Sequence, residues 1–330
     1  MSTAARALWS ASRLRAAAAG SWDADPGTLR DLQAVVGEIA LRGSGAGLML
    51  LSPMGEPRLV VSAGGTGKPW ISLALRVTEH GQPQWQSGAV GAPIQLGDAT
   101  VGALLLYCPP GQSGLRGHYL AGVRAAAAHV ETILARQASQ RETLFAAAEA
   151  LLQMLNAHDP ATARHSRTVR QIARSLGETL GLPAPDLLHL ELAALLHDVG
   201  KVAVPPEILR ADRPLDQEEW GIMRGHPAVG ERVIRSVPDL RPCLGAVRHH
   251  HERWDGLGYP DRLVGPAIPL PARLISLADA YEALRCGRPY QRPRSAEDAL
   301  AEIRASLGTQ FDPGHAHLLP ILADPGGPAA

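Results

Sequence analysis

Histidines and carboxylates gather in the second half of the chain, beside residues that are otherwise apolar. Ten of the thirteen histidines lie at or after His158. A lone inward-facing histidine is more often a satisfied core residue than a ligand, but here five separate segments supply an imidazole or a carboxylate. They hold His165, His197 with Asp198, His226, the run of His249, His250 and His251, and Asp279. Burying a carboxylate is costly unless it is paired or binds a metal, so we interpret the segments as parts of one site.

These side chains are the ligand types of a transition-metal centre. Imidazole and carboxylate without thiolate suit Fe, Mn, Co, Ni or Zn. One carboxylate can bridge two ions, and two ions roughly 3.5 to 4 Å apart can hold both an attacking hydroxide and the phosphate oxygens of an in-line displacement. Water bound to such ions loses a proton near neutral pH, its pKa falling from 15.7 toward about 7. The chemistry predicted by these residues is hydrolysis of a phosphodiester.

Helices are predicted to position the side chains of this site. After Pro160 the apolar residues recur with a period of 3.6, and His165 lies on the same inward face. The residues of this stripe are Val169, Ile172, Ala173, Leu176 and Leu180. Asp216 and Glu219 form a capping-box pattern at the start of another helix. Pro242 suits the first turn of the helix that delivers the histidine run.

Six segments carry most of these residues: DPATARHSRTV, LLHDVGKVAVPPEIL, MRGHPAVGERVI, HHERWDGLGYP, LADAYEAL and GRPY. In order and spacing they resemble the HD-GYP subgroup of the HD-domain phosphohydrolases, over about Leu151 to Pro313. A bare His-Asp pair is a weak signal, but the ordered set with Gly258, Tyr259 and Pro260 is specific. The resemblance implies an all-α bundle of about seven helices. It also implies a phosphodiesterase that hydrolyses cyclic di-GMP to pGpG, with GMP as a further product.

The resemblance implies roles for individual residues. Two divalent metal ions, Fe or Mn, are expected, with Asp198 bridging them. The implied metal ligands are His165, His197, Asp198, His226, His250, His251 and Asp279. Lys201 would stabilise the charge of the scissile phosphate or protonate the leaving oxygen. Asp159 matches a family aspartate near the nucleophilic water.

Contacts to the dinucleotide are implied for the GLGYP loop, through Gly258, Tyr259 and Pro260. Arg288 would bind phosphate or a base, and Tyr290 would stack on a base. His249 has no role in the family and is expected at the surface or behind the ligands.

Four positions depart from the family pattern. The usual second Asp of the LADAYEAL helix is Glu282, which keeps the charge on a longer arm, and the usual Thr-Ser after it is Arg285-Cys286. Some members have a Glu four residues before the first ligand histidine, where this chain has Ala161. None of these changes removes an expected ligand, so they put substrate positioning in doubt more than metal binding.

A smaller α+β domain is predicted ahead of the helical one. From Asp31 to about Leu106 a helix is followed by short apolar runs separated by Gly and Pro, which favours a helix with an antiparallel sheet. The order resembles a GAF domain, chiefly through APIQLGDATVGALLLY and the long helix after it. No residue set marks a ligand pocket, so a structural or dimerising role competes with a sensory one. The expected boundaries are 1–25 for an Ala-rich segment, 26–138 for this domain and 139–325 for the HD-GYP domain.

The long helix that joins the two domains carries an apolar stripe. Between His118 and Asn156 the apolar residues alternate three and four apart, as in a coiled coil. One interpretation is a homodimer formed through residues 120–155, and the other is packing of the helix on its own sheet.

Composition argues against some classes of binding partner. Lys plus Arg and Asp plus Glu both total 32, which argues against duplex nucleic acid or an anionic membrane as partner. No apolar run reaches the roughly 18 to 20 residues of a membrane span. Three scattered cysteines favour a reducing cytoplasm. Two alternative functions stay open: hydrolysis of another cyclic dinucleotide such as cyclic GMP-AMP, and a catalytically weak module that signals by binding.

Overall fold

The computed structural model describes residues 26–41, 45–51, 57–64, 69–86, 88–108, 115–158, 160–286 and 293–323. The chain divides into two compact units, Met1–Glu142 and Thr143–Ala330. Helix α4 (Arg116–His158) contributes residues to both units. The expected domain boundary at 138/139 lies inside this helix, and the Ala-rich segment 1–25 lies outside the described residues.

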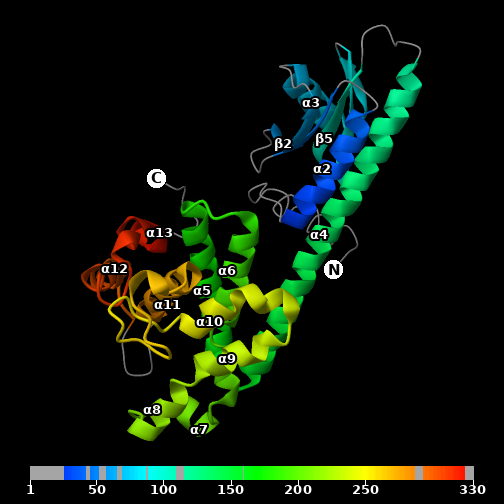
Figure 1. Ribbon diagram of the computed structural model, residues 1–330. Coiled ribbons are helices and arrows are strands. Elements are labelled where there is room, and N and C mark those ends of the chain that lie inside the picture. Colours follow the sequence, from blue (N-terminus) through cyan, green and yellow to red (C-terminus); the bar gives the residue numbers. More distant parts are fainter. Residues whose placement is uncertain are drawn as a thin grey trace. The chain divides into compact units, whose positions relative to one another are not determined.

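The first unit is built on a five-stranded antiparallel sheet, which confirms the predicted α+β class (Figure 1). The strand order is β2-β1-β5-β4-β3. The strands are β1 (Gly45–Leu51), β2 (Pro57–Gly64), β3 (Gln84–Gln86), β4 (Ala89–Leu96) and β5 (Ala99–Tyr107). Helix α2 (Pro26–Ala40) and the first part of α4 share a core with one face of the sheet, and α3 (Pro69–His80) shares a core with the other. The unit therefore has three layers.

The second unit is helical, as predicted (Figure 1). Its longer helices are α5 (Pro160–Thr179), α6 (Ala184–Leu196), α9 (His226–Arg235), α11 (Leu270–Cys286) and α12 (Ala296–Ala305). Shorter helices are α7 (Pro206–Leu209), α8 (Gln217–Met223), α10 (Leu244–His249) and α13 (Leu319–Ala323). The 3₁₀ turns are η2 (Val199–Ala203), η3 (Pro238–Cys243), η4 (Gly265–Ala267) and η5 (Pro313–Leu318).

Helix α6 lies at the centre of the helical unit. Every residue from Leu190 to Leu196 is buried, since α6 packs against α5, α10 and α11. A helix that is apolar on all sides needs such burial. One charged residue on it, Glu191, is fully buried between Arg170 and Arg174 of α5, which compensates its carboxylate. The sequence after α6, His197 and Asp198, is thereby held inside the bundle.

Two predicted helix starts have different outcomes. The capping box is confirmed, because Asp216 accepts the backbone N–H of Glu219 and the Glu219 side chain accepts that of Asp216. Pro242 does not begin the helix that delivers the histidine run. It lies in the 3₁₀ turn η3, and α10 begins two residues later at Leu244.

The apolar stripe of α4 is divided between the two cores of the chain itself. Val123, Ala127 and Val130 are buried against the sheet, whereas Ala148 and Leu155 are buried in the helical unit. These side chains are therefore already covered without a second copy. No helix in the described part of the chain has the length and hydropathy of a membrane span.

Candidate metal centre

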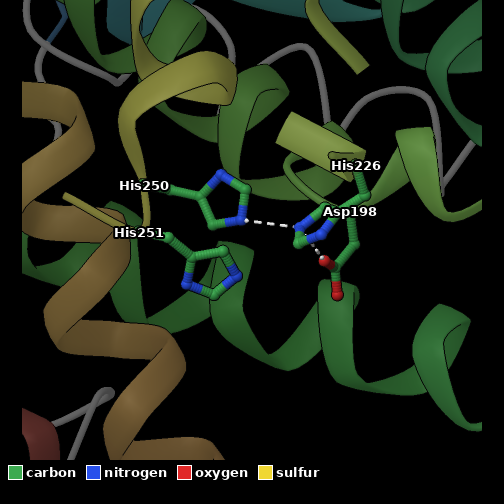
Figure 2. A group of neighbouring side chains, drawn as sticks. All are labelled: Asp198, His226, His250 and His251. Carbon is green, nitrogen blue, oxygen red and sulfur yellow. Dashed lines mark hydrogen bonds and ion pairs between the residues drawn. The ribbon is translucent and has the colours of Figure 1, made fainter. Parts of the chain in front are cut away.

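The structure brings all seven predicted ligand residues together in two neighbouring groups. Asp198, His226, His250 and His251 form the first, and Figure 2 shows these four side chains converging on one space. His165, His197 and Asp279 form the second. Within each group, one donor atom from every residue lies within 4.8 Å of the others. Each group has the residue types and the spacing of a metal site, and the role of these residues as ligands stays a prediction.

Five elements deliver these side chains. His165 lies on α5, His197 and Asp198 follow α6, and His226 is the first residue of α9. His250 and His251 follow α10, and Asp279 lies on α11. Because η2, which follows Asp198, packs closely against α9, Asp198 and His226 are held face to face.

Three histidines are oriented by the backbone of their own helical turn. The Nδ1 atoms of His197, His226 and His250 each contact the carbonyl oxygen three residues earlier, at 2.7, 2.8 and 2.8 Å. A carbonyl can only accept, so each Nδ1 carries the proton and each Nε2 is left with a lone pair. This arrangement leaves Nε2 free to bind a cation, and a partner on the other ring nitrogen is what metal-binding histidines usually have.

The lone pairs on these Nε2 atoms face no hydrogen-bond donor among the other rings, so a cation would satisfy them better. The Nε2 atoms of His226 and His250 face each other at 3.3 Å, although neither carries a proton in the tautomer just derived (Figure 2). The buried Nε2 of His197 makes no hydrogen bond to any described residue. Burial, followed by neighbouring charges, lowers the pKa of His251 to about 3 and lowers that of His250 as well. Neutral imidazoles with unshared lone pairs are suited to metal binding.

Asp198 lies between the two groups. Its Oδ1 is 3.2 Å from His226 Nε2 in the first group, and its Oδ2 is 3.4 Å from His197 Nε2 in the second. Lys201 Nζ lies 2.6 Å from Oδ2. Burial alone would raise the pKa of Asp198, but Lys201 and His197 outweigh it and hold the pKa well below its usual value. The carboxylate is therefore ionised and has one oxygen directed toward each group.

Glu282 has a role that the sequence did not indicate. Its carboxylate contacts Nδ1 of His165, while Asp279 lies 2.9 Å from Nε2 of the same ring. In the absence of a metal ion, burial lowers the pKa of His165, but hydrogen bonds to Asp279 and Glu282 outweigh it and raise the pKa to about 10, so metal binding at this ring requires the loss of a proton. The longer arm of Glu282 thus orients a candidate ligand. Cys286, at another departure from the family pattern, lies 3.1 Å from Glu282.

The GLGYP loop is held at the centre by Glu252, a residue for which the sequence predicted no role. The buried carboxylate accepts the backbone N–H groups of Asp261, at 2.7 Å, and Leu263, at 3.1 Å. His249, expected at the surface or behind the ligands, contacts Asp261 at 2.8 Å and so supports the same loop. The only sequence signal for Glu252 is its position directly after the histidine run.

Within that loop, Tyr259 reaches the candidate ligands and Gly258 permits a close approach. The Tyr259 ring lies 4.9 Å from the His251 ring, centroid to centroid, tilted by 31°. A Cβ atom on Gly258 would come within 2.4 Å of the backbone nitrogen of Arg253, so only glycine fits there. The structure thus sets Tyr259 beside the first group of ligands.

A match to a protein-family model shows to which family this chain belongs. The model of the HD domain matches residues 149–314, which contain all seven candidate ligands. The chain belongs to the HD domain family. The match also contains Lys201 and the GLGYP loop, so the HD domain comprises the whole candidate centre described above.

Curated relatives match the same part of the chain. It is 38% identical over 176 residues to "Cyclic di-GMP phosphodiesterase response regulator RpfG" of Xanthomonas campestris, covering 53% of this chain and 46% of that protein. It is 35% identical over 173 residues to "3'3'-cGAMP-specific phosphodiesterase 2" of Vibrio cholerae, covering 51% and 33%. The chain spans less than half the length of these relatives.

One solved structure to which this chain is similar is the cyclic GMP-AMP phosphodiesterase V-cGAP3 of V. cholerae. The identity is 20% and the TM-score 0.42, with 54% of this chain and 48% of that chain covered.

Three predicted site residues of the HD domain, Asp159, Arg288 and Tyr290, lie outside the described residues, as does the side chain of Ala161.

Proposed function

We propose that this chain is an HD-GYP phosphodiesterase that hydrolyses cyclic di-GMP to pGpG, with GMP as a further product. The observation that carries the proposal is the position of Asp198, an ionised carboxylate with one oxygen toward each of two ligand groups and Lys201 beside it. Two divalent ions, Fe or Mn, would be held by the seven residues of these groups. When bound, they would supply a hydroxide near neutral pH and neutralise phosphate charge.

The chain's own residues would complete the reaction. Lys201 Nζ carries a proton at the edge of the centre, where it can stabilise the scissile phosphate and protonate the leaving oxygen. Asp159 would orient the attacking water. Tyr259, with Gly258 and Pro260, would contact the dinucleotide beside His251, and Arg288 and Tyr290 would bind its phosphate or bases.

The main rival is another cyclic dinucleotide as substrate, since one relative is named as specific for 3'3'-cGAMP. A weak or inactive binding module is less well supported, because both ligand groups have all their predicted residues and Lys201 lies beside Asp198. An anaerobic assay of the metal-loaded chain against cyclic di-GMP, cyclic GMP-AMP and cyclic di-AMP tests the proposal. Turnover highest on cyclic di-GMP is expected, and no turnover on any of the three would refute it.

Metal content is the first quantitative prediction. Two ligand groups, each able to hold one ion, lead us to expect about two Fe or Mn per chain. A third ion would lack the carboxylate that some family members place four residues before the first histidine, because this chain has Ala161 there. Elemental analysis of anaerobically purified protein measures the count. Three tightly held ions would contradict the prediction, and Ala161→Glu is expected to raise the count.

For the first unit, we propose a GAF-like domain at 26–138, joined through α4 to the HD-GYP domain at 139–325. The five-stranded antiparallel sheet with helices on both faces supports this proposal. A cytoplasmic location, expected from the scattered cysteines, is also a proposal.

Homodimerisation through residues 120–155 stays a prediction. Since the apolar stripe is buried in the chain's own cores, a second copy would have to contact other residues of α4, such as Met154, which is 64% exposed. Light scattering on the intact chain at micromolar concentration gives the mass. A dimer that Met154→Lys dissociates is expected, whereas a monomeric wild-type chain would contradict the prediction.

A further inference from the structure

Helix α8 is held by side-chain contacts at its N-terminus rather than by full burial in the core. None of its seven residues is buried, yet its first turn has a complete capping box. Arg213 adds a two-pronged ion pair to Glu219, with Nη1 at 2.7 Å from Oε2. Trp220 on this helix is 45% exposed. A capped helix without a buried face does not serve the core, so its exposed aromatic side chain suggests a binding surface.

Arg224, which ends α8, links this surface to the candidate metal centre. Its guanidinium carbon lies 5.8 Å from the Trp220 ring centroid and 5.7 Å from the Tyr259 ring centroid. The Tyr259 ring in turn lies 4.9 Å from that of His251, a candidate ligand. Only the Tyr259 ring therefore separates the guanidinium from the candidate ligand His251. Along the chain, Arg224 lies two residues before His226.

Arg224 has no acidic partner among the residues that the structure describes. No carboxylate of the described residues lies within ion-pair distance of it, unlike Arg213, Arg248 and Arg253. Its five N–H donors form a rigid fork, and the contacts to the two rings leave these donors for a ligand. Two flat rings beside a guanidinium favour a flat ligand with paired acceptors over a tetrahedral phosphate.

Guanine has the required chemistry. Its O6 and N7 atoms are two adjacent acceptors that an arginine fork binds together, and its face stacks on aromatic rings. Adenine has N7 but carries an amino group in place of O6, so the N–H donors of this amino group would face the N–H donors of the arginine. We infer that Trp220, Arg224 and Tyr259 form a subsite that binds one guanine of the substrate and selects it over adenine. This inference rests on the proposed function, because it presumes a cyclic dinucleotide at the metal centre.

The experiment compares three substrates on the metal-loaded full chain: cyclic di-GMP, cyclic di-AMP and the base-free diester bis(p-nitrophenyl) phosphate. For Arg224→Gln, kcat/KM on cyclic di-GMP is expected to fall about tenfold to a hundredfold, mostly through KM. The loss on the base-free diester should be at least tenfold smaller, and the preference for guanine should collapse. Arg224→Lys should not restore it, since one ammonium cannot form the fork.

Controls separate this inference from its rivals. Arg304→Gln removes an exposed arginine of α12 and is expected to change none of the three rates. Rescue by Arg224→Lys, or equal losses on all three substrates, would overturn the base contact in favour of a phosphate contact. A change in mass by light scattering without a change in KM would overturn it in favour of a protein contact. Wild-type turnover of the base-free diester but of no cyclic dinucleotide would instead refute the proposed function.

Discussion

Replacing Asp198 by alanine is expected to abolish both hydrolysis and tight metal binding. The side chain is buried, ionised and has one oxygen toward each ligand group, so its removal would take a ligand from both of the proposed ions at once. It would also leave the two proposed cations facing each other without the negative charge between them. We expect kcat/KM to fall by about a thousandfold or more, roughly 4 kcal/mol of transition-state stabilisation.

Lys201→Ala is the matched variant for this prediction. Lys201 lies 2.6 Å from Asp198 but offers no lone pair when protonated, so its loss should spare the metal while lowering turnover. Elemental analysis and a phosphodiesterase assay on the same samples separate the two effects. Full activity or wild-type metal content in Asp198→Ala would contradict the assignment of Asp198 as a bridging ligand.

Replacing Gly200 by alanine is expected to damage the centre through the backbone. A Cβ atom at Gly200 would come within 1.9 Å of the carbonyl oxygen of His226 and 2.4 Å of the backbone nitrogen of Gly230. Neither atom can move away by a side-chain rotation, so η2 and α9 must separate. We expect the free energy of unfolding of the helical unit to fall by about 3 kcal/mol, at the upper end for overpacked sites. Separation would also move Asp198 away from His226 and lower the metal content.

Gly245→Ala is the control for this substitution. Gly245 lies on α10, which leads to His250, but a Cβ atom there would meet only the Pro269 ring at an ordinary 3.5 Å. Denaturant unfolding and elemental analysis of both variants make the comparison. The steric argument would be wrong if Gly200→Ala matched Gly245→Ala in both stability and metal content.

The sequence by itself was informative at several places where a short-range rule applies, although the same kind of rule failed at Pro242. The 3.6-residue stripe after Pro160 predicted helix α5, and the spacing of Asp216 and Glu219 predicted the capping box. These features depend on neighbours within a few residues, so the local pattern is enough to find them. The ordered motifs also predicted which seven residues would come together, because their types and order match an HD domain as a set.

Only the tertiary structure decided which faces meet and which atoms point where. The apolar stripe of α4 suits a partner helix or the chain's own cores equally well, and the fold uses it for the cores. Glu282 and Glu252 are ordinary acidic residues in the sequence, yet one holds His165 and the other holds the GLGYP loop. Such contacts join residues far apart in the chain. Their geometry depends on helix packing, which a pattern of residue types along one segment does not contain.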